Sequence, residues 1–579
     1  MCASQTRSRL DNTYQRATGL GIEDIPFIVT WIFLLLFVVL LGALIIGASF
    51  FSFGSGNGIT LEKIIEVYSN PESFRFLLNT VVVGLGAGTI GTLITAVYTW
   101  FVVRTNIPGR KYMRMLAILT AGFPGIIMTF GWIGALSPQI GYLNTITQSI
   151  VGVSVFNIYS VWGIILALSL STLHSGFLLL ETPLKNLSSD LEEASRISGY
   201  SQLETLRHVS LPMLFPALFS AFLLNTLYAI GNFEFVMFFT TFQGGMKTFA
   251  TEIFSLVRLS NIPNYGEAVI LSIPYMLLAM TLITVYAYYT NKRDKFVTVS
   301  GSGSRNDTID LGKYRYAGLG YCLSVWGLAL VVPAIGIFGL ALSPSIGGAF
   351  SAFTLENFGD FFQLNGVIEV FINTLLFAFL GALGVVVVST LISYTTLKYD
   401  HDWSRVGDYA STIPLGLPPI VYGLAVFWMV LVTPGLNNLY GTIFPLVIAI
   451  VLMKTPHGVR IISSNMIQID DELEEASRVC GRSWFDSFRN ITLPLSFQGM
   501  SNAFLWIFID AMKELAGIIL LITTGGNVFT NYIMGVYSND PGALPDIAAG
   551  AMMFSMVIFG FIILQTRFHG GSAGRRQLY

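Results

Sequence analysis

Charged side chains are scarce in this sequence. Asp, Glu, Lys and Arg make up 11% of the 579 residues, whereas soluble proteins average about 25%. Hydrophobic residues reach 53%, so a soluble chain of this length could not cover its surface with polar groups. These figures exclude a cytosolic enzyme and a disordered chain. The formal net charge of −2 gives no general attraction to polyanions, so we expect no nucleic-acid partner.

Motifs for metals, cofactors and nucleotides are also missing. The three cysteines, Cys2, Cys322 and Cys480, are too far apart in sequence to indicate a disulfide framework or a zinc pattern. The five histidines show no H-x-x-H or H-E-x-x-H spacing, and no G-x-x-x-x-G-K-S/T phosphate loop occurs. The sequence therefore predicts no cofactor, no metal site and no catalytic residues. Energy from ATP would have to come through a separate protein.

Long apolar segments are what the chain has in place of charge. A membrane-spanning helix needs about 20 mostly apolar residues, and twelve segments satisfy this. None alternates polar and apolar residues as the strands of a membrane barrel do. We therefore predict an all-α polytopic membrane protein with about 12 transmembrane helices. The segments are 26–50, 74–103, 112–136, 159–181, 213–242, 266–290, 316–342, 368–397, 405–432, 441–463, 495–524 and 546–567.

Basic residues are distributed unevenly between the connections. One set of connections, together with both termini, holds 26 of the 31 Lys and Arg residues, and the opposite set holds four. Because basic residues concentrate on the cytoplasmic side, both termini are predicted to be cytoplasmic and the chain to lie in the cell (inner) membrane, surrounded by lipid. The basic connections are 104–114, 182–212, 291–315, 398–405 and 454–492.

The sequence is internally duplicated. The segment LEEASRISGYSQLETLRHVSLP at 191–212 reappears as LEEASRVCGRSWFDSFRNITLP at 473–494. Each copy belongs to a half with six spans, so the two halves have the same orientation and form two parallel six-helix repeats. The predicted organisation is a first half, 1–290, with its loop at 182–212, then a cytoplasmic linker, 291–315, and a second half, 316–579, with its loop at 464–494.

The repeated loop carries its own helix signals. Patterns of the S-x-x-E type begin two short helices in each copy, with Asp471 in the place of the first serine in the second copy. Gly199 and Gly481 stand between the helices, where a left-handed residue can end a helix. The second helix is expected to end at the Leu-Pro pair before the next span. We interpret the loop as a docking surface; surface helices without a partner are the alternative.

Each copy also contains a longer pattern: Glu-Ala-Ser, three residues, glycine, nine residues, a β-branched residue, any residue and Leu-Pro. This pattern resembles the EAA loop of binding-protein-dependent ABC importer permeases. The resemblance implies that the loop is a coupling helix that docks on a cytoplasmic ATPase. It implies two copies of that ATPase and an extracytoplasmic solute-binding protein as partners. The residues that carry it are Glu193, Ala194, Ser195 and Gly199, with Val209 and Leu211-Pro212, and Glu475, Ala476, Ser477 and Gly481, with Ile491 and Leu493-Pro494.

The fusion of two halves in one chain is similar to the ferric-iron-type permeases of this group. The segment MKELAGIILLITTGG at 512–526 resembles a span of their second half, where a Glu-Leu pair precedes an apolar run. The implied function is transport of a small solute from the binding protein into the cytoplasm, with ferric iron as the first choice. Thiamine, phosphonate, polyamine and an oxyanion are the alternative substrates.

Four ionisable residues fall inside predicted spans, namely Glu234, Asp510, Lys513 and Glu514. Each charge costs about 2.5–3.5 kcal/mol at a helix centre, so these side chains should face protein or water. The last three follow i, i+3, i+4 spacing and would share one helix face. They are candidates for a pathway or gate, and an ion-paired cluster between helices is the alternative. An offset of 282 aligns Asn232 with Glu514, whereas a two-residue shift would align Glu234, and the sequence leaves this open.

An ion-coupled secondary transporter with two parallel halves is the alternative from another class. In that case the membrane charges would bind the coupling ion. The duplicated loops argue against it, because such a transporter needs no ATPase-docking surface.

Overall fold

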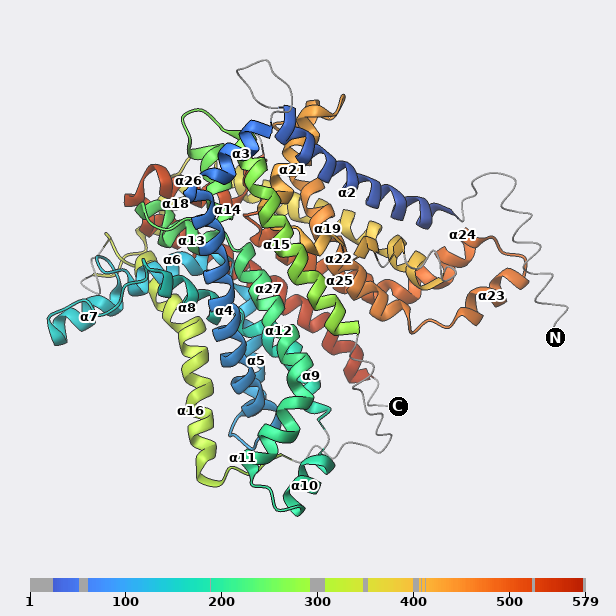
Figure 1. Ribbon diagram of the computed structural model, residues 1–579, viewed down its shortest axis with the longest axis horizontal. Coiled ribbons are helices and arrows are strands. Elements are labelled where there is room, and N and C mark those ends of the chain that lie inside the picture. The colour runs from blue at the N-terminus through green and yellow to red at the C-terminus, as the bar shows by residue number, and fades with distance from the viewer. Residues whose placement is uncertain are drawn as a thin grey trace. The chain divides into compact units, whose positions relative to one another are not determined.

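A computed structural model describes residues 24–50, 61–187, 189–291, 308–346, 352–398, 406–407, 409–411, 413–522 and 526–575. Most of these residues are helical, and the only extended pairing among them is an isolated bridge between Thr105 and Ile309. The all-α fold predicted from the sequence is therefore confirmed (Figure 1).

The α-helices before the linker are α2 (Ile25–Phe50), α3 (Leu61–Ser69), α4 (Pro71–Arg104), α5 (Arg110–Leu119), α6 (Gly125–Leu136), α7 (Tyr142–Val151), α8 (Val161–Ser171), α9 (Leu173–Lys185), α10 (Ser189–Ile197), α11 (Gln202–Thr205), α12 (Leu211–Gly231), α13 (Glu234–Phe239), α14 (Phe249–Phe254) and α15 (Tyr265–Asn291). Those after it are α16 (Arg315–Trp326), α17 (Val332–Ala341), α18 (Glu356–Gln363), α19 (Val367–Lys398), α21 (Pro419–Val432), α22 (Phe444–Met466), α23 (Asp471–Val479), α24 (Trp484–Ser487), α25 (Leu493–Lys513), α26 (Phe529–Asn539) and α27 (Leu544–Arg575). Short 3₁₀ turns are η2 (Thr120–Gly122), η4 (Thr241–Gln243), η7 (Gly312–Tyr314), η9 (Ile413–Gly416), η10 (Asn437–Leu439) and η12 (Pro541–Ala543), and π turns are η3 (Leu206–Ser210), η5 (Ser255–Leu259), η8 (Gly327–Val331) and η11 (Phe488–Thr492).

The described residues contain seven helices long and apolar enough to cross a membrane, or up to ten if each bent pair is one span. The multi-pass character is thus confirmed, but the count of 12 is not. The bent pairs are Arg110–Gly122 with Gly125–Leu136, at 103°, Val161–Ser171 with Leu173–Lys185, at 46°, and Tyr409–Gly416 with Pro419–Val432, at 104°.

Two compact units interleave along the chain. Unit 1 comprises Met1–Gly42, Phe377–Leu415 and Val447–Ala511, and unit 2 comprises Ala43–Leu376, Gly416–Leu446 and Met512–Tyr579. Neither unit coincides with a half of the sequence repeat. The division into halves at 290 and 316 stays a prediction, and most of the predicted linker, 292–307, lies outside the described residues.

Each unit contains the first span of one half packed on a helix of the other half. In unit 2, the Tyr321 hydroxyl of α16 donates to the Ile94 carbonyl of α4 at 3.0 Å. In unit 1, the Thr30 hydroxyl of α2 donates to the Thr395 hydroxyl of α19 at 3.1 Å. This exchange of first spans is one reason why the compact units do not follow the linear repeat.

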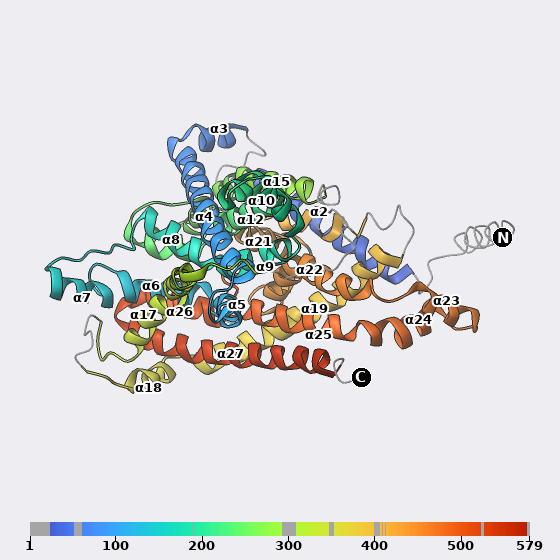
Figure 2. The same ribbon diagram turned by 90° about the horizontal axis from the view of Figure 1, so that it is seen from below.

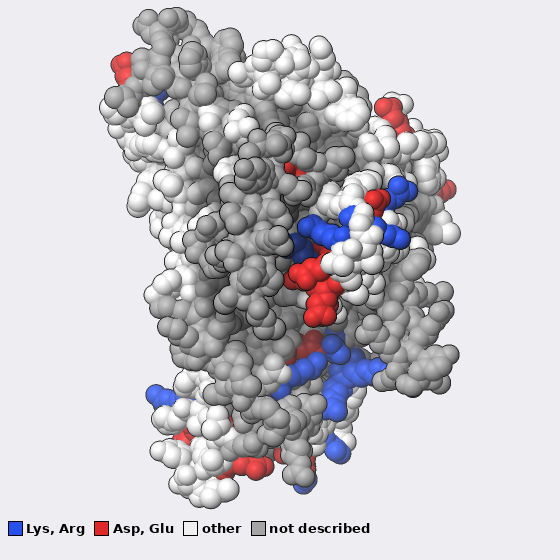
Figure 3. All heavy atoms as spheres, turned by 90° about the vertical axis from the view of Figure 1, so that its right-hand side faces the viewer, with Lys and Arg blue, Asp and Glu red and all other residues white. Residues whose placement is uncertain are grey.

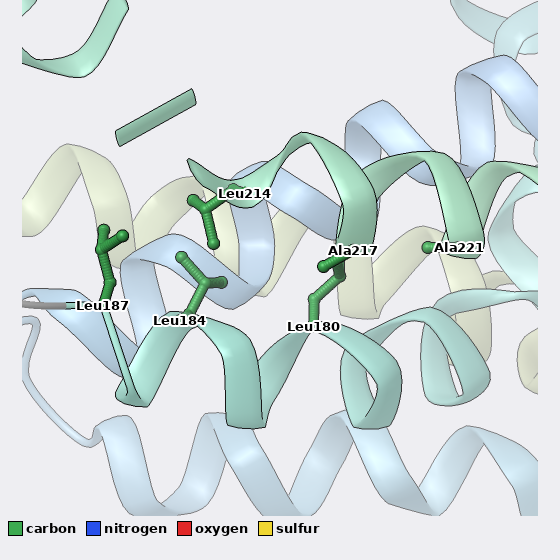
Figure 4. Close-up of a cluster of buried hydrophobic side chains, with 6 residues drawn as sticks. All are labelled: Leu180, Leu184, Leu187, Leu214, Ala217 and Ala221. Atoms are coloured by element: carbon green, nitrogen blue, oxygen red, sulfur yellow. The ribbon is translucent and has the colours of Figure 1, made fainter. Parts of the chain in front are cut away.

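In unit 2, α4 lies against α9 and α12 (Figure 1). Near the first repeated loop, α9 and α12 are joined by a buried apolar cluster (Figure 4). Ala217 and Ala221 present small side chains to the leucines of the other segment, which permits close packing. The two helices that flank the loop are therefore fixed to each other. The cluster comprises Leu180, Leu184, Leu187, Leu214, Ala217 and Ala221.

Glycines let α6 and α17 cross closely in unit 2 (Figure 2). A Cβ atom added to Gly336 would lie 1.9 Å from the Gly131 carbonyl oxygen. One added to Gly134 would lie 2.6 Å from the Gly336 carbonyl oxygen. Only the missing side chains allow this backbone approach, as at other close crossings between membrane helices.

The Leu-Pro pairs do not end the second helix of either repeated loop, contrary to the prediction. The π turn η3 runs directly into α12 before Pro212, and η11 runs directly into α25 before Pro494. Proline lacks the N–H that an α-helix would use. A wider turn at this point lets the helix continue through the proline in both copies.

Two predicted spans, 213–242 and 495–524, are not continuous helices. α12 ends at Gly231 and a new helix, α13, begins at Glu234. α25 ends at Lys513, and turns follow it. A hydropathy average does not register these breaks, because the longer segments that flank each break are mostly apolar.

Candidate functional site

The first repeated loop lies in unit 2 and has the predicted shape, with α10 and α11 separated by Gly199 at φ +92°. Glu192 of α10 forms an ion pair with Arg104 at the end of α4. Its other carboxylate oxygen accepts the Ser210 hydroxyl at 2.7 Å. Arg104 also donates to the Leu187 carbonyl at 3.3 Å. The loop is thus tied to α4 and to the residue that precedes α12.

The second loop, in unit 1, repeats this anchor with different side chains. Glu474 of α23 accepts the Tyr394 hydroxyl of α19 at 2.8 Å and also accepts the Thr492 hydroxyl. Lys398 at the end of α19 donates to the Ile469 carbonyl at 3.1 Å. It also forms an ion pair with Asp471.

The two anchors are equivalent in sequence. Glu192 and Glu474 are related by the offset of 282, and so are the carbonyls of Leu187 and Ile469. In the second span of each half, Asn79-Thr80 and Asn373-Thr374 are related by an offset of 294. The same offset relates the basic residues at the ends of α4 and α19, Arg104 and Lys398. Both halves therefore hold the loop by a glutamate in its first helix and a cation from the second span.

The sequence analysis emphasised the neighbouring glutamates, Glu193 and Glu475. Both are exposed, and the Glu193 side chain retains 57% of its accessible surface. Ala194 and Ala476 are exposed as well. These residues are available to a partner, whereas the preceding glutamate holds the loop to its own protein. The anchoring glutamate is part of the repeated Leu-Glu-Glu sequence and could have been noticed there. The linear sequence does not tell, however, which of the two glutamates points inward.

The serines of the two Glu-Ala-Ser motifs face inward and link the helices of each loop. The Ser195 and Thr205 hydroxyls are 3.0 Å apart. The Ser487 hydroxyl donates to Ser477 at 2.8 Å, and Ser477 is buried. We conclude that these serines set the angle between the two short helices.

Large apolar side chains project from matching positions of the two loops. Ile197 is 86% exposed and Val479 is 87% exposed, and the offset of 282 relates them. Each ends its helix two residues before the glycine, and Gly481 has φ +83°, close to the value at Gly199. Exposed apolar residues placed identically in both copies indicate an interaction surface rather than chance.

Capping fixes the second helix of each loop. The Ser201 backbone N–H donates to the Glu204 carboxylate at 2.8 Å, while the Glu204 N–H donates to the Ser201 hydroxyl at 3.4 Å. The bonds from Ser201 hold the pKa of the Glu204 carboxyl below its usual range. Ser483 caps α24 in the same way.

For the first helix of each loop, α10 and α23, the predicted cap is not confirmed. The N-cap of α23 is Asp470, which accepts the Glu472 N–H, and not Asp471. The cap is displaced because Asp471 pairs with Lys398. In the first copy, the Ser189 side chain lies outside the described residues.

Glu234 lies at the break after α12. The Asn232 amide donates to its carboxylate at 3.2 Å, and the Asn232 side-chain oxygen accepts the Phe235 N–H at 3.1 Å. An added Cβ on Gly125 would be 3.4 Å from the Glu234 carboxyl carbon. Gly125 begins α6, so the carboxylate lies close to the N-terminus of that helix.

The break that follows α25 contains Lys513 and Glu514, and both residues belong to unit 2. Lys513 donates to the Ala121 carbonyl at 3.1 Å. The Glu514 carboxylate accepts the Gly517 N–H at 3.0 Å. Because α25 ends at Lys513, Glu514 lies outside the helix, and the prediction that it shares a helix face with Asp510 is wrong.

Asp510 belongs to unit 1 and forms an ion pair with Lys454 at 2.6 Å. Lys454 was counted in the connection 454–492, but it lies within α22. The predicted span 441–463 already contains Lys454, but the count of basic residues placed it in the connection, so it was not considered as a membrane cation. Asp510 thus forms an ion pair between two helices, as the alternative interpretation expected, and a role in a pathway or gate stays a prediction.

Two hydrogen bonds indicate how the breaks correspond. The Thr80 hydroxyl of α4 accepts the Phe249 N–H at 3.1 Å, and the Thr374 hydroxyl of α19 accepts the Phe529 N–H at 2.8 Å. The threonines are related by an offset of 294 and the phenylalanines by 280. The offset of 280 also relates Glu234 to Glu514, which favours the two-residue shift left open by the sequence.

Comparison with known proteins gives a family for this architecture. The family model of the binding-protein-dependent transport system inner membrane component matches residues 88–296 and 397–569, about two thirds of the chain. The chain belongs to this family. Each match contains one repeated loop, so the permease carries two copies of the family's transport unit.

Relatives of this permease extend over most of its length. The Fe(3+)-transport system permease protein FbpB 2 of Haemophilus influenzae is 25% identical over 472 residues, which cover 80% of this chain and 84% of the relative. The ferric transport system permease protein FbpB of Actinobacillus pleuropneumoniae is 23% identical over 526 residues, covering 89% and 75%. A probable sulfate transport system permease protein, cysT of Chlorella vulgaris, is 23% identical over 240 residues, or 40% of this chain and 85% of its own length. The single-half relative agrees with the duplication.

Proposed function

We propose that this permease moves ferric iron from a solute-binding protein into the cytoplasm, driven by two copies of a separate ATPase. One ATPase copy would dock on each repeated loop, and both termini would be cytoplasmic. The observation that carries the proposal is the duplicated loop. In each copy one glutamate, Glu192 or Glu474, anchors the first helix, while an exposed glutamate and an exposed apolar side chain face outward.

Hydrogen bonds and packing connect the first loop to its neighbouring helices, so a displacement of the loop would move those helices. Glu192 is bonded to Arg104 of α4 and to Ser210, which directly precedes α12. The apolar cluster beneath it holds α9 to α12. A partner that pulls α10 therefore displaces three helices together, because interfaces of this kind shift as packed bodies and do not deform continuously.

The charged breaks in the spans are the proposed pathway or gate. Discontinuous helices at membrane depth are tolerated where they line a cavity or are buried in protein, and transporters use them to bind substrate. Glu234 and Glu514 supply carboxylate oxygens, which suit a hard cation such as ferric iron. Two separate carboxylates give the weak successive sites that conduction requires.

The substrate assignment is supported by the names of the two long relatives and by these carboxylates. A cationic substrate such as thiamine or a polyamine would use the same groups, whereas phosphonate or another oxyanion would be repelled by them. Uptake of labelled ferric iron, with each alternative solute as competitor, tests the choice. The assay uses vesicles that contain the permease, the ATPase and the cognate binding protein.

Coupling is tested by a double charge reversal, Glu193→Lys with Glu475→Lys. We expect the double variant to insert normally but to lose substrate-stimulated ATP hydrolysis, with milder loss in each single variant because the other loop still docks. The matched control is Glu356→Lys with Glu369→Lys, which reverses two exposed carboxylates outside the loops. Normal ATPase copurification and uptake in the double variant would show that the loops do not couple.

The secondary-transporter alternative predicts a different result from the same vesicles. Uptake driven by an ion gradient, without ATPase subunits, would overturn the proposal. Uptake that requires ATP and the binding protein supports it.

A further inference from the structure

A basic hollow lies beside the first repeated loop, at the end of α4, the start of α5 and the end of α9. Its volume is about 270 Å³, several times the ~30 Å³ share of one water molecule. Thr308, where the described chain resumes within the predicted linker, also lines the hollow. Basic side chains also gather beside acidic ones in the lower part of Figure 3, at the height of α10 and α11 in Figure 1. The lining residues are Val102, Val103, Arg104, Arg110, Lys111, Arg114, Glu181, Lys185 and Thr308.

The hollow has more positive charge than its own carboxylate can balance. Glu181 is the one acidic residue in the lining, and it already accepts bonds from Arg114 at 2.8 Å and Lys185 at 2.7 Å. Arg110 and Lys111 form no ion pair with any residue that the structure describes. Two cations that line the hollow are therefore not neutralised by any carboxylate among the described residues.

Arg104, which also lines the hollow, has a buried N–H group without a hydrogen-bond acceptor among the described residues. Its side chain is 7% exposed, and its Nε atom is buried with no hydrogen-bond partner among the described residues. A buried guanidinium N–H without an acceptor is costly, more so than a neutral donor. The atom lies in a side chain that lines the hollow, so an anionic oxygen bound there could satisfy it.

The N-terminus of α5 also favours binding of an anion. Its N-cap is Gly109, in the left-handed region at φ +69°, and no side chain caps the helix. Arg110 and Lys111 occupy the first turn, where the helix dipole disfavours cations. Free backbone N–H groups, the positive helix end and two cations together form an arrangement that binds phosphate.

The outer flank of α5 identifies the kind of phosphate. Tyr112 is 69% exposed and Met115 is 60% exposed, while Met113 and Ala117 on the other flank are buried. Exposed aromatic and aliphatic side chains next to basic ones are typical of a helix at the membrane interface. The connection 104–114 belongs to the predicted cytoplasmic set, and the cytoplasmic leaflet carries the anionic lipids.

We propose that this hollow is a binding site for the phosphate group of an anionic phospholipid. The headgroup phosphate would lie among Arg104, Arg110 and Lys111, with the acyl chains along the exposed flank of α5. By the offset of 294, Ser404 stands in the second half where Arg110 stands in the first, whereas Lys398 and Arg405 keep basic side chains in place of Arg104 and Lys111.

The site would act on the first loop. Arg104 is shared between the hollow and the anchor at Glu192, so a bound phosphate would fix the cation that holds α10. This consequence for coupling rests on the proposed function, whereas the binding itself does not.

The test measures lipid binding to the full chain purified in detergent. Thermal unfolding is followed while short-chain phosphatidylglycerol, phosphatidylcholine or inorganic phosphate is added. The test variant is Arg110→Ala with Lys111→Ala. The control is Lys313→Ala with Arg315→Ala, which removes the same charge from exposed positions outside the hollow.

We expect phosphatidylglycerol, and not phosphatidylcholine, to raise the unfolding temperature of the wild type and of the control. Each basic residue near an anionic surface contributes about fivefold in affinity, so the double variant should bind roughly 25-fold more weakly. The charge-conserving variant Arg110→Lys with Lys111→Arg should retain binding, which separates lost charge from misfolding.

Equal phosphatidylglycerol binding by the alanine variant and the control would overturn the proposal. Stabilisation by inorganic phosphate as strong as that by the lipid would overturn the lipid assignment and identify a site for free phosphate. ATP hydrolysis of the assembled transporter in vesicles with and without phosphatidylglycerol then tests the effect on coupling separately.

Discussion

Replacing Glu192 by alanine removes the carboxylate that joins α10 to α4 and to the start of α12. Arg104, which is 6% exposed, would keep its bond to the Leu187 carbonyl but lose its counter-charge. Removing one partner of a buried ion pair costs about 3–5 kcal/mol, because the remaining charge stays buried. The anchor of α10 should therefore weaken by a factor of roughly 10² to 4 × 10³.

Hydrogen exchange of the peptide that covers 191–200 measures this loss directly. We expect Glu192→Ala to speed exchange there strongly and Glu193→Ala, one residue away on the exposed side, to leave it unchanged. The double replacement Arg104→Met with Glu192→Leu should exchange more slowly than Glu192→Ala, because an apolar pair leaves no buried charge. The reasoning is refuted if Glu192→Ala and Glu193→Ala give the same exchange.

Three further predictions concern single contacts. Lys454→Met should lower the unfolding temperature by removing the cation that pairs with Asp510, and adding Asp510→Leu should recover most of the loss in the same melting assay. The cost should stay below the about 3–5 kcal/mol of a fully buried pair, because the two side chains are 14% and 25% exposed. Gly199→Val should reduce ATPase binding while Gly199→Asn reduces it less, because no atom crowds this position and only its φ of +92° disfavours a β-branched side chain. The Glu204 carboxyl has a lowered pKa in the folded loop, so its stabilising effect is present above the unfolded pKa and is lost as pH falls through the folded one; hydrogen exchange of 201–206, corrected for intrinsic rates, should rise in acid, and Glu204→Gln should abolish that pH dependence.

The loop could be predicted from sequence because its determinants are local. The bend at Gly199 and the box from Ser201 to Glu204 need only residues within a few positions of each other, and both are present as expected. The anchor was missed because its partner is remote. Glu192 differs from Glu193 only through Arg104, which lies 88 residues earlier in the chain.

The breaks in the spans were not predicted from the sequence, for a different reason. A hydropathy window averages over a span and cannot register where a helix stops when the residues after the stop are also buried. After Gly231 the helix ends and Asn232 supplies a side-chain acceptor for the next one. Lys454 shows another error, since it was counted with the connection 454–492 although it lies inside both the predicted span 441–463 and α22.

The crossing of α6 and α17 allows a sharp test of how the first span of the second half is seated. A Cβ atom on Gly336 would lie 1.9 Å from the Gly131 carbonyl oxygen, so Gly336→Ala must push the two helices apart. Overpacking of this kind costs about 1–3 kcal/mol. Gly320, in α16 of the same apolar span, has no atom within 4 Å of its added Cβ. Gly320→Ala should therefore be neutral or stabilise by about 0.5–1 kcal/mol, because alanine favours a helix over glycine. Both variants are compared by thermal unfolding in the same detergent. If Gly336→Ala melts at or above the temperature of Gly320→Ala, the backbones do not approach as closely as the structure requires.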